Sequence, residues 1–442
     1  MHQWPAAHRD RRCWLRGHDG SQGARLPPSG HRADRPRQPS SLPAALYQVA
    51  TAALSPSDIA TANRTLLRGK DVRVVMADVT GVDVEGSAVV LADGSYEAYD
   101  YLILATGSAY GFFGHDEWQP HVFVLKSLED ALAIRTHLLG RFEAATRSDD
   151  DTAIAKLLTF VIVGGGPTGV ELAGTIAEFS RSILPRDFAS LRPDVTRIIL
   201  CEGASRLLTG FTEAQSAFAL KTLRSLGVDV RLGDDVKEIT AGCVKVGGET
   251  IVTATVLWCA GTKARPAAEW LGVEASKHCG VPVAANCSVP SKPDIFVLGD
   301  TATFKGKDRK PLPGLAAVAK QQGRLVAELL NARIAGKTES STFRYRDWGT
   351  LAVIGRSRAV ATFGDVHLTG FVAWLSWALI HLALLVDFRS RILVYVNWAW
   401  EWLHSNRGVR LIIRPADAKG GRPATPGRSA KRAMKKASAT GT

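Results

Sequence analysis

A glycine-rich segment between a strand-like and a helix-like segment limits most strongly what this 442-residue chain can fold into. Residues 160–163 (FVIV) are apolar, residues 164–169 (GGGPTG) follow, and residues 170–182 favour a helix. In this context the first glycine permits a tight turn, the second lets a pyrophosphate approach the backbone, and the third lets the helix pack on the strand. These glycines are Gly164, Gly166 and Gly169. The sequence therefore predicts a dinucleotide whose phosphates lie at the helix N-terminus.

The acid that follows the next strand indicates which dinucleotide binds. Residues 196–201 favour a second strand, and Glu202 comes directly after it. An acid at that strand end accepts hydrogen bonds from the adenosine ribose, which favours NADH over NADPH. Arg206 leaves the alternative open, because an arginine nearby can serve a 2′-phosphate.

Short β-rich segments recur along the chain and alternate with helical patterns, as in doubly wound α/β proteins. They lie at residues 72–76, 88–91, 101–105, 228–232, 254–260 and 294–298. The strand at 101–105 runs into Thr106 and Gly107, and the strand at 254–260 closes with Gly261. The strand at 294–298 ends in Gly299 and Asp300. Asp300 is therefore expected at the sheet edge where such folds bind ligands.

The formal net charge of +13 is concentrated at the two ends of the chain. Residues 1–45 carry +5 and residues 414–442 carry +7, which leaves +1 for residues 46–413. A nearly neutral body argues against a nucleic-acid partner. Residues 414–442 lack aromatic and β-branched apolar residues, so we expect a disordered basic tail. Such a tail either keeps the protein soluble or is attracted to anionic lipid.

Residues 1–45 have an unusual composition, rich in Arg, His, Pro and Gly without an apolar run. We expect this segment to be disordered and not native in character. If the codons of residues 8–17 are shifted by one base, permitted choices spell a strand and glycine loop, IVIVGAGFGG, although only the glycine arising at Trp14 is forced. A similar shift at 31–45 runs straight into the in-frame Leu46. We interpret this as an out-of-frame start; DNA with no such open frame ahead of the Leu46 codon would rule it out.

Two apolar stretches near the C-terminal end suggest contact with a membrane. Between Asp365 and Asp387 no residue is charged, and a Trp-rich segment follows at 392–403. The first stretch reaches the length of about 20 residues that spans a bilayer, but Gly370 and several polar residues weaken that interpretation. We favour two helices lying in the bilayer surface, with one span or a buried dimer interface as the alternatives. His381, inside the first stretch, is expected to pack rather than to bind a ligand.

The cysteines offer neither a redox dithiol nor a metal site. The six are Cys13, Cys201, Cys243, Cys259, Cys279 and Cys287. No two stand in a CxxC relation, which fits reduced, buried thiols. No other segment has metal-ligand spacing, so no metal is expected.

An ordered series of short motifs resembles one family, the type II NADH dehydrogenases. The motifs are ATGS (105–108), GHDEW (114–118), FVIVGGGPTGVELAG (160–174), LWCAGT (257–262), IFVLGD (295–300), AKQQG (319–323) and LAVIGRSRAV (351–360). Members of this family are single-chain flavoproteins that pass electrons from NADH through FAD to a membrane quinone without pumping protons. The resemblance covers residues 46–413.

The resemblance implies two Rossmann-like domains and a membrane anchor. Residues 46–110 and 286–345 would form an incomplete FAD-binding domain, split in sequence by an NADH-binding domain at 111–285. Residues 346–413 would form the C-terminal anchor, whose part from residue 366 onward contacts the lipid bilayer. The protein would then lie peripherally on the cytoplasmic face of the inner membrane. A homodimer is left open.

The resemblance also assigns the site residues. NADH would bind to Gly164, Gly166, Gly169 and Glu202, and FAD to Thr106, Gly107 and Asp300, with Gly261 as a further cofactor-binding residue. Glu171 and Gln321 would lie near the flavin ring and the quinone and help to position or protonate the quinone. The alternative for each of these two residues is that it is an ordinary helix-surface side chain.

This chain departs from the family's pattern at three places. The family's first glycine loop, which holds the FAD pyrophosphate, has no counterpart in the in-frame sequence. Ala317 stands where the family often has Gln, and Trp348 stands near the position of a frequent Lys. Lys320 is a candidate substitute for part of their chemistry.

We therefore compare three candidate functions. The first is an FAD-dependent NADH:quinone oxidoreductase. The second is a non-catalytic, NADH-binding membrane protein that has lost FAD, and the third is a ferredoxin-type or sulfide:quinone reductase of the same architecture. A yellow purified protein favours the first and a colourless one the second. The absence of paired cysteines weakens the sulfide version, and the Trp-rich segment weakens a soluble reductase.

Overall fold

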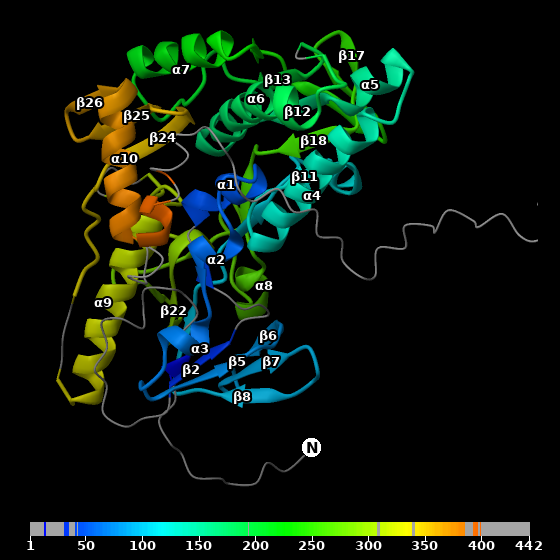
Figure 1. The fold of residues 1–442 in the computed structure, drawn as a ribbon. Coiled ribbons are helices and arrows are strands. Elements are labelled where there is room, and N and C mark those ends of the chain that lie inside the picture. Colours follow the sequence, from blue (N-terminus) through cyan, green and yellow to red (C-terminus); the bar gives the residue numbers. More distant parts are fainter. Residues whose placement is uncertain are drawn as a thin grey trace, which may run out of the picture. The chain divides into compact units, whose positions relative to one another are not determined.

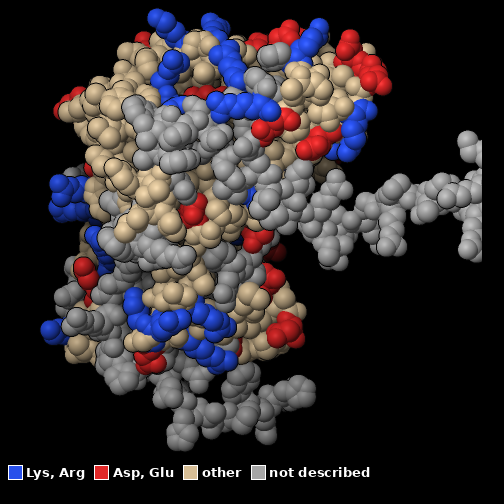
Figure 2. Space-filling view, viewed as in Figure 1, with Lys and Arg blue, Asp and Glu red and all other residues tan. Residues whose placement is uncertain are grey.

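The computed structural model describes residues 13–14, 31–34, 40–41, 43–192, 194–306, 310–337, 341–384, 392–396 and 398. The expected tail at 414–442 lies outside these residues. On the face shown in Figure 2, Lys and Arg side chains are interleaved with Asp and Glu, in keeping with the small net charge of residues 46–413.

The first sheet brings the early strands of the chain next to a strand from residues 292–297. Its order is β21 (Ser288–Val289), β22 (Lys292–Val297), β9 (Tyr101–Leu104), β1 (Cys13–Trp14), β2 (His31–Asp34) and β5 (Val72–Val75). All neighbours are parallel except β21 and β22. The carboxyl ends of β9 and β22 therefore meet at one edge, as the sequence predicts for Gly107 and Asp300.

A few residues of the N-terminal segment form short strands. Strands β1 and β2 lie inside the first sheet, and β3 (Ser40–Ser41) pairs with β4 (Ala60–Thr61). Strand pairing uses main-chain groups that every non-proline residue carries, so it does not require an apolar run. The other residues up to 42 lie outside the described part of the chain.

The second sheet is wholly parallel and confirms the predicted strand–loop–helix segment. Its order is β11 (Phe123–Val124), β18 (Thr255–Trp258), β12 (Thr159–Val163), β13 (Arg197–Glu202) and β14 (Val228–Leu232). Every residue of β12 is buried. Four helices accompany it, namely α4 (Leu128–Ala145), α5 (Asp151–Leu157), α6 (Pro167–Asp187) and α7 (Glu213–Ser225). Helix α6 starts directly after the glycine loop.

Besides the first and second sheets, the chain forms small antiparallel sheets and short helices. The strands are β6 (Val79–Asp83), β7 (Ala88–Leu91), β8 (Tyr96–Ala98), β15 (Val236–Thr240), β16 (Cys243–Val246) and β17 (Glu249–Val252). The short helices include α1 (Leu46–Ala50), α2 (Pro56–Ile59), α3 (Asn63–Leu66) and the 3-10 segments Pro43–Ala45, Asp116–His121 and Gly299–Thr301. Strand β10 (Ser108–Tyr110) pairs with β19 (Thr262–Ala264), where the chain passes between the first and the second sheet.

The chain returns to the first sheet soon after β19. Helix α8 (Ala267–Leu271) and β20 (Val281–Pro282) follow β19, and β20 pairs with β23 (Ala302–Thr303). Leu271 and Val281 share an apolar cluster with residues of β7, β9 and β22. These residues therefore pack with the first sheet, because β19 has already returned the chain to it.

The C-terminal part packs on the glycine-loop helix. Helix α9 (Ala316–Ile334) is followed by the antiparallel strands β24 (Thr350–Gly355), β25 (Arg358–Phe363) and β26 (Val366–Thr369), and then by α10 (Gly370–Leu384). Figure 1 shows α10 beside β24–β26, and a Cβ added to Gly174 of α6 would collide with the carbonyl oxygen of Ile354. Helix α6 and β24 are therefore in direct backbone contact.

The uncharged run expected to be helical from residue 366 begins as a strand. Residues 366–369 pair with β25, and the chain turns into α10 at Gly370, whose φ is +74°. A positive φ is a conformation that glycine adopts without strain, so the residue ends the strand. Among the described residues, no helix is long and apolar enough to cross a bilayer.

Candidate active site

The glycine loop has the geometry that a bound pyrophosphate needs. Gly164 has φ +111°, and a Cβ there would lie 2.8 Å from the backbone nitrogen of Ala260. A Cβ on Gly169 would collide with the carbonyl oxygen of Gly164, so only glycine lets the helix come this close. A Cβ on Gly166 would meet no atom within 4 Å, which leaves its face open for a ligand.

Glu202 is fixed at the edge of this loop by main-chain donors. Its carboxylate accepts hydrogen bonds from Gly165 N at 2.5 Å and from Ala204 N at 2.8 Å. Arg206 is committed elsewhere, because its guanidinium donates to the carbonyl oxygens of Phe211 and Thr209 at 2.8 and 2.9 Å. The acid therefore lies at the candidate nucleotide site, and the arginine is held by its own loop.

A cavity of about 460 Å³ lies against the loop and the end of β13. Its lining includes Gly164, Glu202, Asp234, Asp235, Phe113 and Trp258. Lys237, which also lines it, forms an ion pair with Asp235 at 3.6 Å. The acidic lining opposes an additional phosphate group, because like charges at close range repel. The cavity therefore suits NADH better than NADPH.

Gly261 is in close contact with Phe113, one of the residues that line this cavity. Its φ is +64°, and a Cβ there would lie 2.7 Å from the ring of Phe113 and 3.0 Å from the carbonyl oxygen of Gly111. Glycine is therefore needed for close approach between the turn after β18 and the aromatic residue that lines the cavity.

The second candidate site lies where β9 and β22 end side by side. The hydroxyl of Thr301 accepts a hydrogen bond from Gly107 N at 2.8 Å and lies 3.0 Å from the hydroxyl of Thr106. Ser108 Oγ donates to Asp300 Oδ2 at 2.6 Å. These bonds lock the two predicted strand ends to each other. Sequence reasoning had not selected Ser108 or Thr301, although each directly flanks a predicted residue.

Two neighbouring glutamines of α9 have different roles. The buried Gln322 accepts a hydrogen bond from Gly299 N at 2.8 Å and thus braces the loop that carries Asp300. The side-chain amide of Gln321 donates to the carbonyl oxygen of Arg346 at 2.8 Å and accepts from its amide nitrogen at 3.0 Å. Gln321 therefore joins α9 to the segment before Trp348.

Glu171 is a residue of α6 whose side chain is buried against β24, so it is not an exposed helix-surface residue. Val353 N donates to its Oε1 at 3.4 Å. Burial raises the pKa of Glu171 to about 8, and this single hydrogen bond opposes the shift. Burial also raises the pKa of Cys259 to about 12, to which the charge of Glu171 contributes. A carboxyl with this pKa carries a proton at neutral pH and can deliver it.

The comparisons with known proteins agree with this geometry. The family described as "Pyridine nucleotide-disulphide oxidoreductase" matches residues 35–323, and "NDH2 C-terminal domain" matches residues 348–406. The Mycobacterium tuberculosis protein "Type II NADH:quinone oxidoreductase Ndh" is 37% identical over 382 residues, which cover 83% of this chain and 81% of that protein. This chain belongs to the type II NADH:quinone oxidoreductases.

Two further comparisons support the same family and fold. A second M. tuberculosis member, NdhA, is 34% identical and covers 83% of this chain and 81% of its own length. The solved structure of NDH2 from Plasmodium falciparum in complex with NADH superimposes with a TM-score of 0.84. It covers 92% of this chain and 100% of that chain at 18% identity, which shows a shared fold.

The remaining sequence expectations concern thiols, metals and the membrane segment. Of the described cysteines, Cys201 and Cys287 are buried but Cys279 is exposed, so burial holds for only part of the set. No cluster of metal ligands occurs among the described residues. His381 is buried, stacks on Trp377 and hydrogen-bonds to the carbonyl oxygen of Trp377 at 2.8 Å, which confirms its packing role.

Proposed function

We propose that this type II enzyme oxidises NADH and passes the electrons through FAD to a membrane quinone without pumping protons. The link between the two candidate nucleotide sites supports this most directly. Ser108, hydrogen-bonded to Asp300, and Tyr110 both belong to β10, and Tyr110 lies within interaction range of Thr168 in the glycine loop. One short strand thus connects the residues assigned to FAD with those assigned to NADH.

The described residues fit the flavin at the strand ends. Gly107 has φ +71° and a Cβ there would meet no atom within 4 Å, so the loop leaves space for a ligand. A Cβ on Gly314 would lie 2.9 Å from Asp300 Oδ1, which shows how closely the chain approaches that acid. We assign Thr106, Gly107 and Asp300 to FAD on this basis. The expected position of the first phosphate loop, after β1, lies outside the described residues.

The chain's own residues supply binding and a proton. Bound FAD supplies the two-electron chemistry that no amino-acid side chain can perform. Gly164, Gly166 and Gly169 cradle the NADH pyrophosphate, and Glu202 accepts hydrogen bonds from its ribose. Reduction of a quinone consumes two electrons and two protons, and the protonated Glu171 carboxyl holds one such proton in a buried position. Gln321 is assigned to the quinone side.

Helix α10 presents an apolar face that fits a lipid surface. Phe371, Val372, Leu375 and Leu379 are 52%, 58%, 43% and 60% exposed. The opposite face is buried, with Trp377 only 2% exposed. Residues 392–396 repeat this pattern, since Val394 is buried while Ile392 and Tyr395 are exposed. One apolar face per helix is the pattern of helices lying in the bilayer interface.

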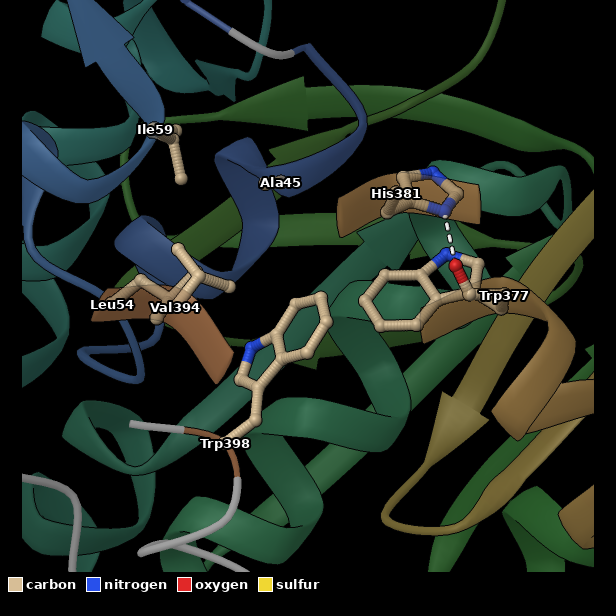
Figure 3. A pocket seen from close by; sticks show the side chains of 7 residues that line it. All are labelled: Ala45, Leu54, Ile59, Trp377, His381, Val394 and Trp398. Atoms are coloured by element: carbon tan, nitrogen blue, oxygen red, sulfur yellow. Dashed lines mark hydrogen bonds between the residues drawn. The ribbon is translucent and has the colours of Figure 1, made fainter. Parts of the chain in front are cut away.

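The buried face of this segment is fixed to the body of the protein. Figure 3 shows Trp377, His381 and Trp398 with Leu54 and Val394 around an apolar gap of about 10 Å³. The indole of Trp398 donates to Gln48 Oε1 at 3.0 Å. We therefore propose a peripheral protein on the cytoplasmic face of the membrane, with lipid covering the exposed face. A second copy of the chain is the alternative cover.

The purified full-length protein tests the proposed activity. We expect the visible absorption of bound flavin, its bleaching by NADH without oxygen, and its return when a soluble quinone analogue is added. A colourless protein that still binds NADH would instead identify the non-catalytic remnant. Bleaching by NADH without reoxidation by the quinone analogue would contradict the assignment of quinone as the acceptor.

A further inference from the structure

Lys126 connects the two candidate nucleotide sites, although no motif includes it. Its ammonium donates to Ser108 Oγ at 3.2 Å, and Ser108 donates in turn to Asp300 Oδ2. The same ammonium lies over the ring of Tyr110, 5.1 Å from the centroid. Tyr110 in turn lies within interaction range of Thr168 in the glycine loop. Lys126 therefore contacts two residues. Ser108 is hydrogen-bonded to the FAD residue Asp300, and Tyr110 lies near the NADH loop.

The ammonium is held at this place by the surrounding structure. The backbone nitrogen of Lys126 donates to Asp130 Oδ2 at 3.1 Å, next to the capping box that starts α4. Desolvation lowers the pKa of Lys126, while the charge of Asp300 opposes that shift. Arg265 is a second cation within electrostatic reach. Lys126 thus accompanies the acid that we assign to FAD.

We propose that Lys126 is a positioning residue that keeps a positive charge beside the flavin and thereby favours its reduced form. The inference rests on the proposed FAD binding. Reduction adds two electrons and a proton from NADH to the flavin and so adds negative charge to it. A fixed cation nearby stabilises that charge more in a partly desolvated site than in water. Lys126 itself exchanges no atom or electron in the reaction.

The flavin reduction potential of Lys126→Met tests this role. Methionine keeps most of the side chain's length and removes its charge, whereas Lys126→Arg keeps the charge. In equilibrium with a reference dye, we expect Lys126→Met to shift the flavin tenfold toward the oxidised form, which is about 30 mV for a two-electron couple. We expect Lys126→Arg to stay within about threefold of the parent protein on the same scale.

Lys263→Met is the matched control. Lys263 lies opposite Ala109 in the β10–β19 pair and loses the same charge, but its side chain contacts Asp116 instead of the Ser108 group. Its potential should equal that of the parent. If the parent protein retains flavin and Lys126→Met has an unchanged potential, the inference is overturned while the proposed function stands. A parent protein without flavin overturns both.

Discussion

Ser108 donates a hydrogen bond of 2.6 Å to Asp300 across 192 positions of the sequence. This contact joins the ends of β9 and β22, which are neighbours in the first sheet. Thr301 adds a second link through Gly107 N. The pair fixes the acid that we assign to FAD before any ligand binds, so the site is preorganised.

Ser108→Ala should weaken flavin retention. A hydrogen bond to a charged group contributes about 1.5 kcal/mol or more, which corresponds to roughly a tenfold change in affinity. Flavin released on gel filtration and titrated back measures the change. Ser95→Ala is the matched control, because it removes a hydrogen bond of the same length to Asp93 on an exposed turn. Equal flavin affinity in both variants would argue that the Ser108–Asp300 contact does not organise the site.

Glu171→Gln should change the dependence of stability on pH. The pKa is raised from 4.5 to about 8, so the folded state keeps a proton that the unfolded state has released between these values. The free energy of unfolding of the parent therefore falls as pH rises from about 4.5 to 8, by at most about 1.4 kcal/mol per pH unit. The variant cannot ionise, so we expect its stability relative to the parent to grow through that window. Urea unfolding at several pH values measures this.

The same variant should slow quinone reduction. If Glu171 supplies a proton, replacing it lowers the rate of quinone-dependent reoxidation by about 100-fold, and the parent's rate falls as pH rises through about 8. Reduction of the flavin by NADH should change little. Glu178→Gln, two turns further along α6, is the control. An unchanged pH profile in Glu171→Gln would leave Glu171 with a packing role only.

Glu202→Gln should reduce the preference for NADH over NADPH. The amide keeps an acceptor for one of the two main-chain donors and removes the negative charge that faces a 2′-phosphate. We expect the ratio of kcat/KM values to move at least about tenfold toward NADPH, which is 1.4 kcal/mol. Glu238→Gln, an exposed acid of β15 paired with Lys245, should leave the ratio unchanged. A constant ratio in both variants contradicts the role given to Glu202.

Replacing Phe371, Leu375 and Leu379 together by serine should release the protein from membranes. Each exposed apolar side chain contributes up to about 1.5–3 kcal/mol when it enters an apolar phase, so vesicle binding should fall at least tenfold. Sedimentation with vesicles containing anionic lipid measures binding. Val252→Ser, at an apolar residue of β17 that is 53% exposed, is the control. Unchanged vesicle binding together with dissociation of a dimer would assign this face to a second copy instead.

The amino-acid sequence by itself determined the local elements of this protein. The buried strand at 159–163, the glycine loop and the start of α6 follow from an apolar run, three glycines and a helical pattern within about 25 residues. The strand ends at Gly107 and Asp300 were also predictable, because each is encoded by a short apolar run and the residues directly after it.

Only the tertiary structure decided which of these ends meet and what surrounds them. Nothing near Glu171 in the sequence indicates that β24 covers it, yet that burial sets its pKa. Gln322, Thr301 and Lys126 act through partners 18 to 195 positions away, as in the contact between Thr106 and Thr301. The strand at 366–369 likewise depends on its pairing with β25. Local patterns encode elements, whereas burial and electrostatic coupling depend on neighbours that only the folded chain brings together.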